Sequence, residues 1–258
     1  MSETTVLIRD EGPVRLLTLN RPQRLNALDE QMKDELTTAL KDAAQDQRVA
    51  AVVITGAGRA FSAGGDLERF AAMYESKSWQ AVQDFTDLNF PRAFAYFPKP
   101  LIAAINGPAV GWGATMPLMC DLRLMSRTAR MAFAFLRVGV TPEFGSSFLL
   151  PRLVGLGRAL ELVLTAREIH PEEALALGLV NRLCEPEELL PQTLALARRL
   201  AQLPAPAVRM AKQALYHGAA DSLEHTLAYE IGLFQQAMQT PEHYQAVKAM
   251  QQALAAKG

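Results

Sequence analysis

Two glycine-rich turns are the places where the backbone of this chain could do chemistry. One runs from Gly56 to Gly65 and the other from Ala103 to Thr115. Each follows an apolar run typical of a buried strand and precedes a segment typical of a helix start. Because the first N–H groups of a helix have no partner inside it, such a turn can hold an anion or a developing oxyanion. Alternatively, each turn is a plain strand-to-helix connection whose glycines serve packing.

Known phosphate-binding and catalytic motifs do not fit these turns. Phe61 stands where a dinucleotide-binding fingerprint would have its third glycine, and neither turn ends in Gly-Lys-Ser/Thr. The sequence also lacks Gly-x-Ser-x-Gly and His-Glu-x-x-His. What remains is a pair of backbone donors. Two turns at the carboxyl ends of neighbouring strands can each aim one N–H at a single oxygen, which stabilises an enolate or a tetrahedral oxyanion. Such a site still needs an acid or a base.

The first half of the chain predicts a mixed α/β arrangement around these turns. Strand, glycine turn and helix occur at 50–70 and again at 101–120. Strand 50–55 is continuously apolar, which predicts burial on both faces. The other predicted elements are a hairpin of 6–9 and 14–20, a helix from the N-cap Asp29 to about Gln45, and strands 122–126 and 130–135.

Helical periodicity dominates the second half. Pro171 and Gly178 bracket a short helix, 180–183 is predicted to be the last strand, and everything from Glu187 onward is predicted to be helical. The clearest hinge is at 204–206. We predict a core at 1–200 that carries the site, followed by a helical region at 201–258 that packs on the core or on a neighbouring subunit.

Composition indicates an ordinary globular protein. With 258 residues, of which 50% are hydrophobic, the chain can bury a large core. A net charge of −1 without a basic run argues against nucleic acid or an anionic membrane as a partner. Cys120 and Cys184 have neither metal-site nor redox spacing, so we expect two reduced core thiols and no metal. No span long and apolar enough for a membrane and no signal-peptide pattern occur, which predicts a cytoplasmic protein.

Three motifs in order give the chain a family resemblance. Asn20–Leu28 (NRPQRLNAL), Phe61–Leu67 (FSAGGDL) and Asn106–Gly113 (NGPAVGWG) together resemble the crotonase, or enoyl-CoA hydratase/isomerase, superfamily from about residue 6 to the end. The resemblance implies an α/β fold, a spiral of ββα units with a helical C-terminal trimerisation region, and thus a homotrimer or a dimer of trimers. It also implies an acyl-CoA substrate, with coenzyme A as part of that substrate and no separate cofactor.

The resemblance further implies a binding site. The thioester carbonyl would lie between the N–H groups of Ala63 and Trp112, with Arg24 as the phosphate partner. The C-terminal aromatic and lysine with which the family often touches the nucleotide are absent from 249–254. The residues expected along coenzyme A are Gln23, Arg24, Leu25, Ala27, Ser62, Ala63, Gly65, Asp66 and Leu67.

Departures from the hydratase pattern bear on the reaction. The two positions where hydratases of this family carry glutamates fall on Thr115 and Phe135. Neither side chain can act as a general acid or base near neutral pH. Glu143, directly after a proline, instead resembles the catalytic glutamate of the Δ3,Δ2-enoyl-CoA isomerase branch. Thr115, Phe135 and Phe144 would line the acyl pocket. Enclosure by Phe135, Phe144 and Phe148 would raise the pKa of Glu143.

The predicted function is therefore Δ3-to-Δ2 enoyl-CoA isomerisation by one carboxylate and a backbone oxyanion hole, in fatty acid β-oxidation or related acyl-CoA degradation. Three alternatives remain open. Glu143 could act as the lone acid/base of an enoyl-CoA hydratase. The scaffold could carry another acyl-CoA reaction, such as ring isomerisation or thioester hydrolysis. The chain could also be a non-catalytic family member that binds an acyl-CoA or a partner without turnover. Separately, Glu143 could merely cap the helix near Gly145 or face solvent.

Overall fold

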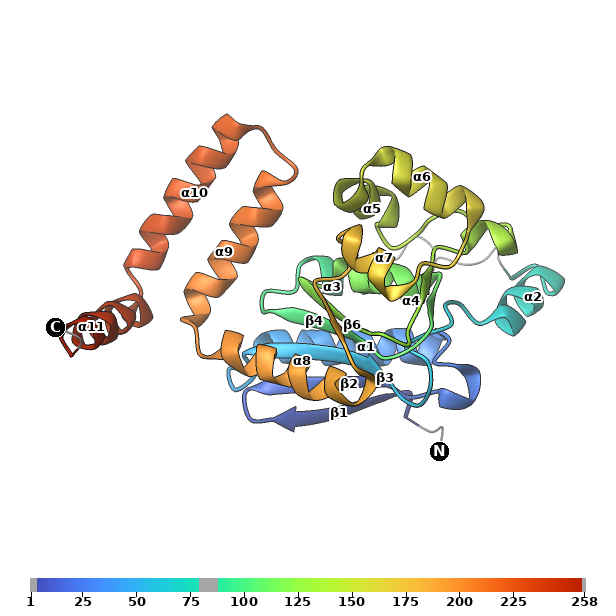
Figure 1. Cartoon of the computed structure of the whole chain (residues 1–258), viewed down its shortest axis with the longest axis horizontal. Coiled ribbons are helices and arrows are strands. Elements are labelled where there is room, and N and C mark those ends of the chain that lie inside the picture. Colours follow the sequence, from blue (N-terminus) through green and yellow to red (C-terminus); the bar gives the residue numbers. More distant parts are fainter. Residues whose placement is uncertain (1–3, 79–87, 257–258) are drawn as a thin grey trace.

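A six-stranded sheet forms the centre of the computed structural model, which describes residues 4–78 and 88–256 (Figure 1). The strand order is β1-β2-β3-β4-β6-β8, in which β1 is antiparallel to β2 and all other neighbours are parallel. The predicted hairpin is confirmed, since β1 and β2 pair directly. The strands are β1 (Val6–Glu11), β2 (Val14–Leu19), β3 (Ala51–Gly56), β4 (Leu101–Ile105), β6 (Leu122–Ser126) and β8 (Arg182–Cys184).

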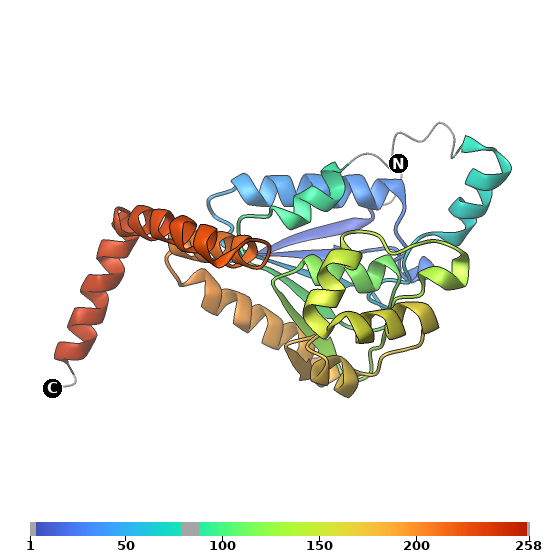
Figure 2. The same cartoon turned by 90° about the horizontal axis from the view of Figure 1, so that it is seen from above.

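The sheet is covered on both faces, as the apolar runs of its central strands predict. Along β3, Val52 and Ile54 belong to one hydrophobic cluster, and Ala51 and Val53 belong to another. Alternate residues of a strand point to opposite faces, so this strand is buried twice. In Figure 2 the helices α1 (Glu30–Gln45) and α3 (Asn89–Ala95) lie on one side of the sheet, and α8 (Pro186–Ala201) lies on the other.

Helix α1 has the predicted bounds because its sequence signals agree with one another. The Asp29 side chain accepts a hydrogen bond of 2.9 Å from the Met32 amide, which satisfies one of the free N–H groups of the first turn. The apolar face is buried as the spacing predicts. Its buried residues are Met32, Leu36, Ala39, Leu40 and Ala43.

Asp29→Ala is expected to lower the free energy of unfolding by about 1 kcal/mol through loss of this cap. Asp29 also contacts Arg21 (Nε to Oδ2, 3.1 Å), so charge and capping must be separated. Asp29→Asn is the matched control, because it keeps the capping oxygen and removes the charge. Urea unfolding of the three proteins measures the effect; an equal loss in both variants would assign it to the ion pair instead.

Short elements surround the glycine turns. Helix α2 (Leu67–Glu75) follows the first turn, and the second turn continues into β5 (Ala109–Val110) and the single helical turn α4 (Trp112–Thr115). Strand β5 pairs in parallel with β7 (Met131–Ala132). The strand predicted at 130–135 is thus only two residues long, because the chain enters a 3-10 helix at Phe135–Val138.

The C-terminal part is helical, as predicted. The last strand runs over Arg182–Cys184 rather than 180–183. Leu179 and Val180 instead close the end of α7, because their amides donate to the Ala174 carbonyl. The predicted hinge is confirmed by the break between α8 and α9. The helices are α5 (Ser146–Val154), α6 (Leu156–Thr165), α7 (Pro171–Ala176), α9 (Ala205–Gly218), α10 (Leu223–Met238) and α11 (Pro241–Ala255).

Helices α9–α11 form an arm that stands beside the sheet in both views (Figures 1 and 2). Its root is fixed to the core by Lys212 Nζ and Tyr216 OH, which bond to the two carboxylate oxygens of Asp121 at 2.9 and 3.0 Å. The boundary predicted at residue 200 stays a prediction, although it lies close to the start of this arm. Over the described ranges, no helix combines the length and hydropathy needed to cross a membrane.

Candidate active site

The two glycine turns pack directly against each other. The amides of Phe61 and Ser62 both donate to the Pro108 carbonyl at 3.1 Å, and the Val110 amide donates to the Ser62 carbonyl at 2.9 Å. At Gly113 an added Cβ would lie 2.2 Å from the Ser62 carbonyl oxygen, so only glycine allows this approach. The pairing inferred from the sequence is therefore present, and it brings residues 61–64 beside residues 108–113.

One of the two predicted oxyanion donors has a free amide in the part of the chain that the structure describes. Trp112 is the first residue of α4, and no described group accepts from its N–H. The Ala63 amide, in contrast, donates to the Leu25 carbonyl at 2.9 Å. A thioester oxygen would therefore have to share the Ala63 proton with Leu25, a residue held in a left-handed conformation (φ 51°).

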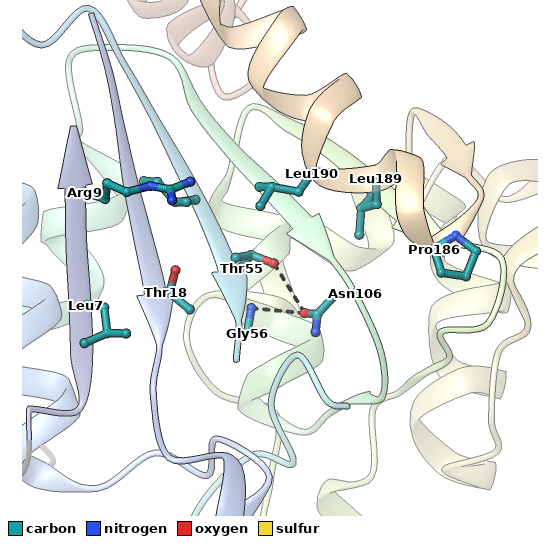
Figure 3. Close-up of a pocket in the computed structure, with 10 residues that line it drawn as sticks. Leu7, Arg9, Thr18, Thr55, Gly56, Asn106, Pro186, Leu189 and Leu190 are labelled. Atoms are coloured by element: carbon teal, nitrogen blue, oxygen red, sulfur yellow. Dashed lines mark hydrogen bonds between the residues drawn. The ribbon is translucent and has the colours of Figure 1, made fainter. Parts of the chain in front are cut away.

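Two asparagines, to which sequence analysis gave no role, hold these turns in place. Asn106 Oδ1 accepts from the Gly56 amide at 3.0 Å and lies 3.4 Å from Thr55 Oγ1, as Figure 3 shows. Asn26 Nδ2 donates to the carbonyls of Ala57 and Ala60 at 2.9 and 2.8 Å. The available signal was an asparagine directly beside each glycine turn or its neighbouring loop, because a side-chain amide that becomes partly or fully buried must find hydrogen-bond partners.

Glu143 lies against Thr115, so the structure brings together two positions that are 28 residues apart in sequence. Thr115 Oγ1 donates to Glu143 Oε1 at 2.8 Å, and Thr115 is fully buried. The backbone of Glu143 is fixed separately, because its carbonyl accepts from the Ser146 amide (2.9 Å) and the Ser146 hydroxyl (2.6 Å) at the start of α5. The Glu143 carboxylate thus points toward α4, which argues against a side chain that only caps α5.

The surroundings of Glu143 suit a proton carrier. Glu143 is exposed when the whole residue is considered, but its carboxyl group is largely enclosed. The enclosure of the carboxyl group determines its pKa. Burial raises the pKa of Glu143 to about 7, against the opposing effect of the Thr115 hydroxyl. A carboxyl group with a pKa near the working pH can both take and return a proton.

Aromatic rings gather next to Glu143. Phe144 packs against Phe90, Phe94 and Trp112 with ring centroids 5.0, 5.3 and 6.1 Å away. Phe135 is buried in the same hydrophobic cluster. Phe148 differs from our expectation: it is 46% exposed, and the Arg152 guanidinium lies over its ring at 3.4 Å. Of the predicted acyl-pocket residues, Thr115 and Phe144 therefore lie beside Glu143, and Phe135 is buried in the main core, whereas Phe148 faces outward.

The residues expected along coenzyme A lie on the loop before α1 and on the first glycine turn. Gln23, Arg24 and Leu67 are exposed, and Leu25, Ala63, Gly65 and Asp66 are partly exposed. Ala27 and Ser62 are buried, and the Ser62 hydroxyl donates to the Asn26 carbonyl at 2.7 Å, so its side chain supports the loop.

Charged members of this set have partners within the protein. Arg21 reaches Asp66 Oδ2 at 3.2 Å, and Arg24 forms a bidentate pair with Glu68 at 2.6 and 2.8 Å. Arg24 would have to leave Glu68 in order to bind a phosphate.

Other features of the described residues stand apart from this site. A cavity of about 380 Å³ between β1–β3 and α8 includes Arg9, Thr18 and Asn106 in its lining but neither Glu143 nor Trp112 (Figure 3). Both cysteines are buried free thiols, as expected. Over residues 4–78 and 88–256, no three His, Cys, Asp or Glu side chains are grouped so as to hold a metal ion.

Comparison with known proteins identifies the family. The sequence model described as Enoyl-CoA hydratase/isomerase matches residues 9–254. The chain belongs to the enoyl-CoA hydratase/isomerase family. It is 34% identical to the short-chain-enoyl-CoA hydratase of Clostridium acetobutylicum over 96% of this chain and 95% of that protein. It is 33% identical to the crotonyl-CoA hydratase of Syntrophomonas wolfei over 91% and 90%.

Solved structures agree with this family membership. A crystal structure of an enoyl-CoA hydratase from Bacillus anthracis superposes with a TM-score of 0.91 at 30% identity, covering 96% of both chains. The crotonase-type α/β fold, with ββα units and C-terminal helices, is thereby confirmed.

Proposed function

We propose that this enzyme moves the double bond of 3-enoyl-CoA thioesters to the 2-position, with Glu143 as its only acid/base group. The observation that carries the proposal is the contact between Glu143 Oε1 and the Thr115 hydroxyl. By the family resemblance, position 115 is where a hydratase has one of its two glutamates. Here a neutral hydroxyl fills it, and a single carboxylate with a pKa near 7 comes from the loop before α5.

The chemistry needs only one carboxylate. Glu143 removes a proton from C2, the electrons of the C2–H bond pass into the thioester carbonyl, and a dienolate forms across C1 to C4. The Trp112 amide would hold the oxyanion. The Ala63 amide would assist it by sharing its N–H proton between the Leu25 carbonyl and the oxyanion. Glu143 then returns the proton to C4, which leaves the double bond between C2 and C3 and the carboxylate restored. The aromatic side chains packed around Phe144 would help to limit exchange of the carried proton with water.

Hydration of 2-enoyl-CoA is the second candidate, and the printed names of the relatives favour it. Both curated relatives and the solved structure compared above are called hydratases. In this case Glu143 alone would activate water and protonate C2. The arrangement around Thr115 favours isomerisation, because no second carboxylate lies at either of the two hydratase positions.

A product assay separates the two candidates. The purified protein is incubated with a 3-enoyl-CoA and, separately, with the matching 2-enoyl-CoA, and the conjugated thioester is followed by its ultraviolet absorbance. Isomerisation raises the absorbance in the first reaction, whereas hydration lowers it in the second. A protein that hydrates the 2-enoyl thioester and leaves the 3-enoyl thioester unchanged would contradict the proposal. A protein that binds both thioesters and turns over neither would favour a non-catalytic role.

Coenzyme A is proposed to lie along residues 23–27 and 62–67, with Arg24 at a phosphate. Glu68→Gln is expected to tighten coenzyme A binding by a small factor, roughly twofold, because it releases Arg24 from an exposed ion pair, and exposed pairs of this kind are weak. Calorimetric titration at low salt measures the change. Glu75→Gln, at the other end of α2, is the control for net charge. Equal effects in both variants would count against a specific Arg24 contact.

A homotrimer or dimer of trimers is also proposed. The arm of α9–α11 carries large apolar side chains that are more than half exposed in a single chain, and a soluble monomer rarely leaves so many together. They are Leu215, Leu223, Ile231, Phe234, Met238, Tyr244, Met250 and Leu254. Light scattering in solution tests this; a monomeric mass would contradict it.

A further inference from the structure

We infer that Thr115 is a positioning residue for Glu143. Its hydroxyl holds Oε1 of the carboxyl group, and Oε2 carries the proton from C2 to C4. The inference rests on the proposed function and deepens it, since it assigns the proton step to one atom.

The geometry of the Thr115 hydroxyl carries this assignment. Its oxygen lies 2.8 Å from Glu143 Oε1 and 3.2 Å from the Trp112 carbonyl oxygen. A hydroxyl has one proton, and the shorter contact to the carboxylate is the stronger of the two. Within the described part of the chain, Oε2 has no hydrogen-bond partner. One oxygen of the carboxylate is therefore held by the protein, and the other is available to substrate.

The hydrogen bond from the Thr115 hydroxyl to Glu143 Oε1 can form in both protonation states of the carboxyl group. When Glu143 is ionised, Oε1 accepts from Thr115 as a carboxylate oxygen. After Oε2 takes the C2 proton, Oε1 becomes the carbonyl oxygen of the acid and still accepts from the same hydroxyl. The Oε2–H bond then breaks as the proton passes to C4, so no group has to reorient during the reaction. The carboxyl plane stays fixed between the two transfers, which favours return of the same proton.

Thr115 is the only described side chain that bonds to this carboxyl group. Glu143 forms no ion pair over the described ranges, and the nearest cation on α5, Arg152, packs on the Phe148 ring and donates to the Phe148 carbonyl. Burial and the Thr115 hydroxyl are accordingly the influences on the pKa of Glu143, and they act in opposite directions. Removing the hydroxyl should therefore raise this pKa further, and no neighbouring charge is placed to compensate.

Thr115 also joins the base to the oxyanion donor. It lies one turn after Trp112 in α4, and the Trp112 carbonyl is its weaker acceptor. The residue that orients the carboxyl group is thus built into the same helical turn as the free Trp112 amide. This arrangement fixes the position of Oε2 relative to the proposed oxyanion position.

The test compares Thr115→Val, which keeps the shape but loses the donor, with Thr115→Ser, which keeps the donor. In Thr115→Val, kcat/KM for a 3-enoyl-CoA below neutral pH is expected to fall about tenfold, a modest effect for a hydrogen bond to a charged group. The acidic limb of its pH profile should move up by about one pH unit. KM at high pH should change little, because packing is preserved. Thr115→Ser should restore the pH profile to that of the wild type.

Proton retention gives a second readout that a merely structural role would not move. With substrate deuterated at C2, the fraction of label delivered to C4 should drop in Thr115→Val and recover in Thr115→Ser. An unchanged pH profile and unchanged retention in Thr115→Val would overturn the inference, as would a serine variant that behaves like the valine variant.

Titration of Glu143 separates failure of the inference from failure of the proposed function. Carbon NMR of protein labelled at the glutamate carboxyl carbons, with the signal assigned by its loss in Glu143→Gln, reports the pKa without turnover. A higher pKa in Thr115→Val and a restored one in Thr115→Ser support the Thr115 contact even for an enzyme with another reaction. Glu143→Gln with wild-type isomerisation would instead refute the proposed function.

Discussion

Glu143→Gln is expected to lower kcat for isomerisation of a 3-enoyl-CoA by ~10²–10⁴-fold, the usual contribution of general acid/base catalysis. Glutamine keeps the size of the side chain, and its carbonyl oxygen can still accept from the Thr115 hydroxyl. It cannot take a proton from C2 near neutral pH. The loss should therefore appear in kcat, with little change in KM. Initial rates of absorbance increase at pH 8 measure it.

The pH dependence should identify the same group. Since burial raises the pKa of Glu143 to about 7, kcat/KM of the wild type is expected to rise with pH through that value, as the base becomes ionised. The residual activity of Glu143→Gln should not follow this curve. Glu187→Gln, which changes an exposed glutamate on α8, is the matched control and should keep both rate and profile. A glutamine variant with wild-type rate would place the base elsewhere.

The free energy of unfolding should change with pH in the opposite direction to the activity. A carboxyl group whose folded-state pKa lies above the ordinary 4.5 holds its proton more firmly in the native state, so its contribution to stability falls as pH rises between about 4.5 and 7. Glu143→Gln removes this dependence. At pH 8 the variant should be no less stable than the wild type in urea unfolding, while being nearly inactive. Such a separation is typical of a residue kept for function at a cost in stability.

The sequence was most informative where several local signals agreed. The bounds and buried face of α1 followed from its N-cap and its spacing, and the burial of β3 on both faces followed from its continuous apolar run. The final strand begins two residues and ends one residue later than predicted, and the strand predicted at 130–135 was too long. Both are short runs whose ends depend on what the neighbouring segments contact.

The site was predictable in its members but only partly in its contacts. Motif residues placed the two turns together, and Glu143 and Thr115 were both singled out. Their mutual hydrogen bond depends on how the loop before α5 folds back on α4, which no local pattern encodes. The engagement of the Ala63 amide by Leu25 has the same origin, since it requires a left-handed residue from a distant loop. Phe148 faces outward and stacks with Arg152, four residues later in α5; this i,i+4 spacing was present in the sequence but was not used.

Gly64→Ala is expected to lower kcat/KM by ~10²–10³-fold, the loss typical of one oxyanion donor. Gly64 has a φ of 97°, and an added Cβ would lie 2.7 Å from the Val110 carbonyl oxygen and 3.5 Å from the Trp112 amide nitrogen. The methyl group would therefore stand over the free amide proposed to hold the oxyanion. Rates with a 3-enoyl-CoA, measured well below the unfolding temperature, test this.

Backbone strain must be separated from obstruction, and the chain offers a matched control. Gly12 also has a positive φ (63°), but an added Cβ there meets nothing within 4 Å. Gly12→Ala should thus share the strain, roughly 1–2 kcal/mol, and keep its activity. Free coenzyme A, which has no thioester carbonyl, should bind Gly64→Ala nearly as well as it binds the wild type, whereas an enoyl-CoA should bind less tightly. Equal losses of activity in the two alanine variants would mean that strain explains the effect, and the Trp112 amide would then need another test as the oxyanion donor.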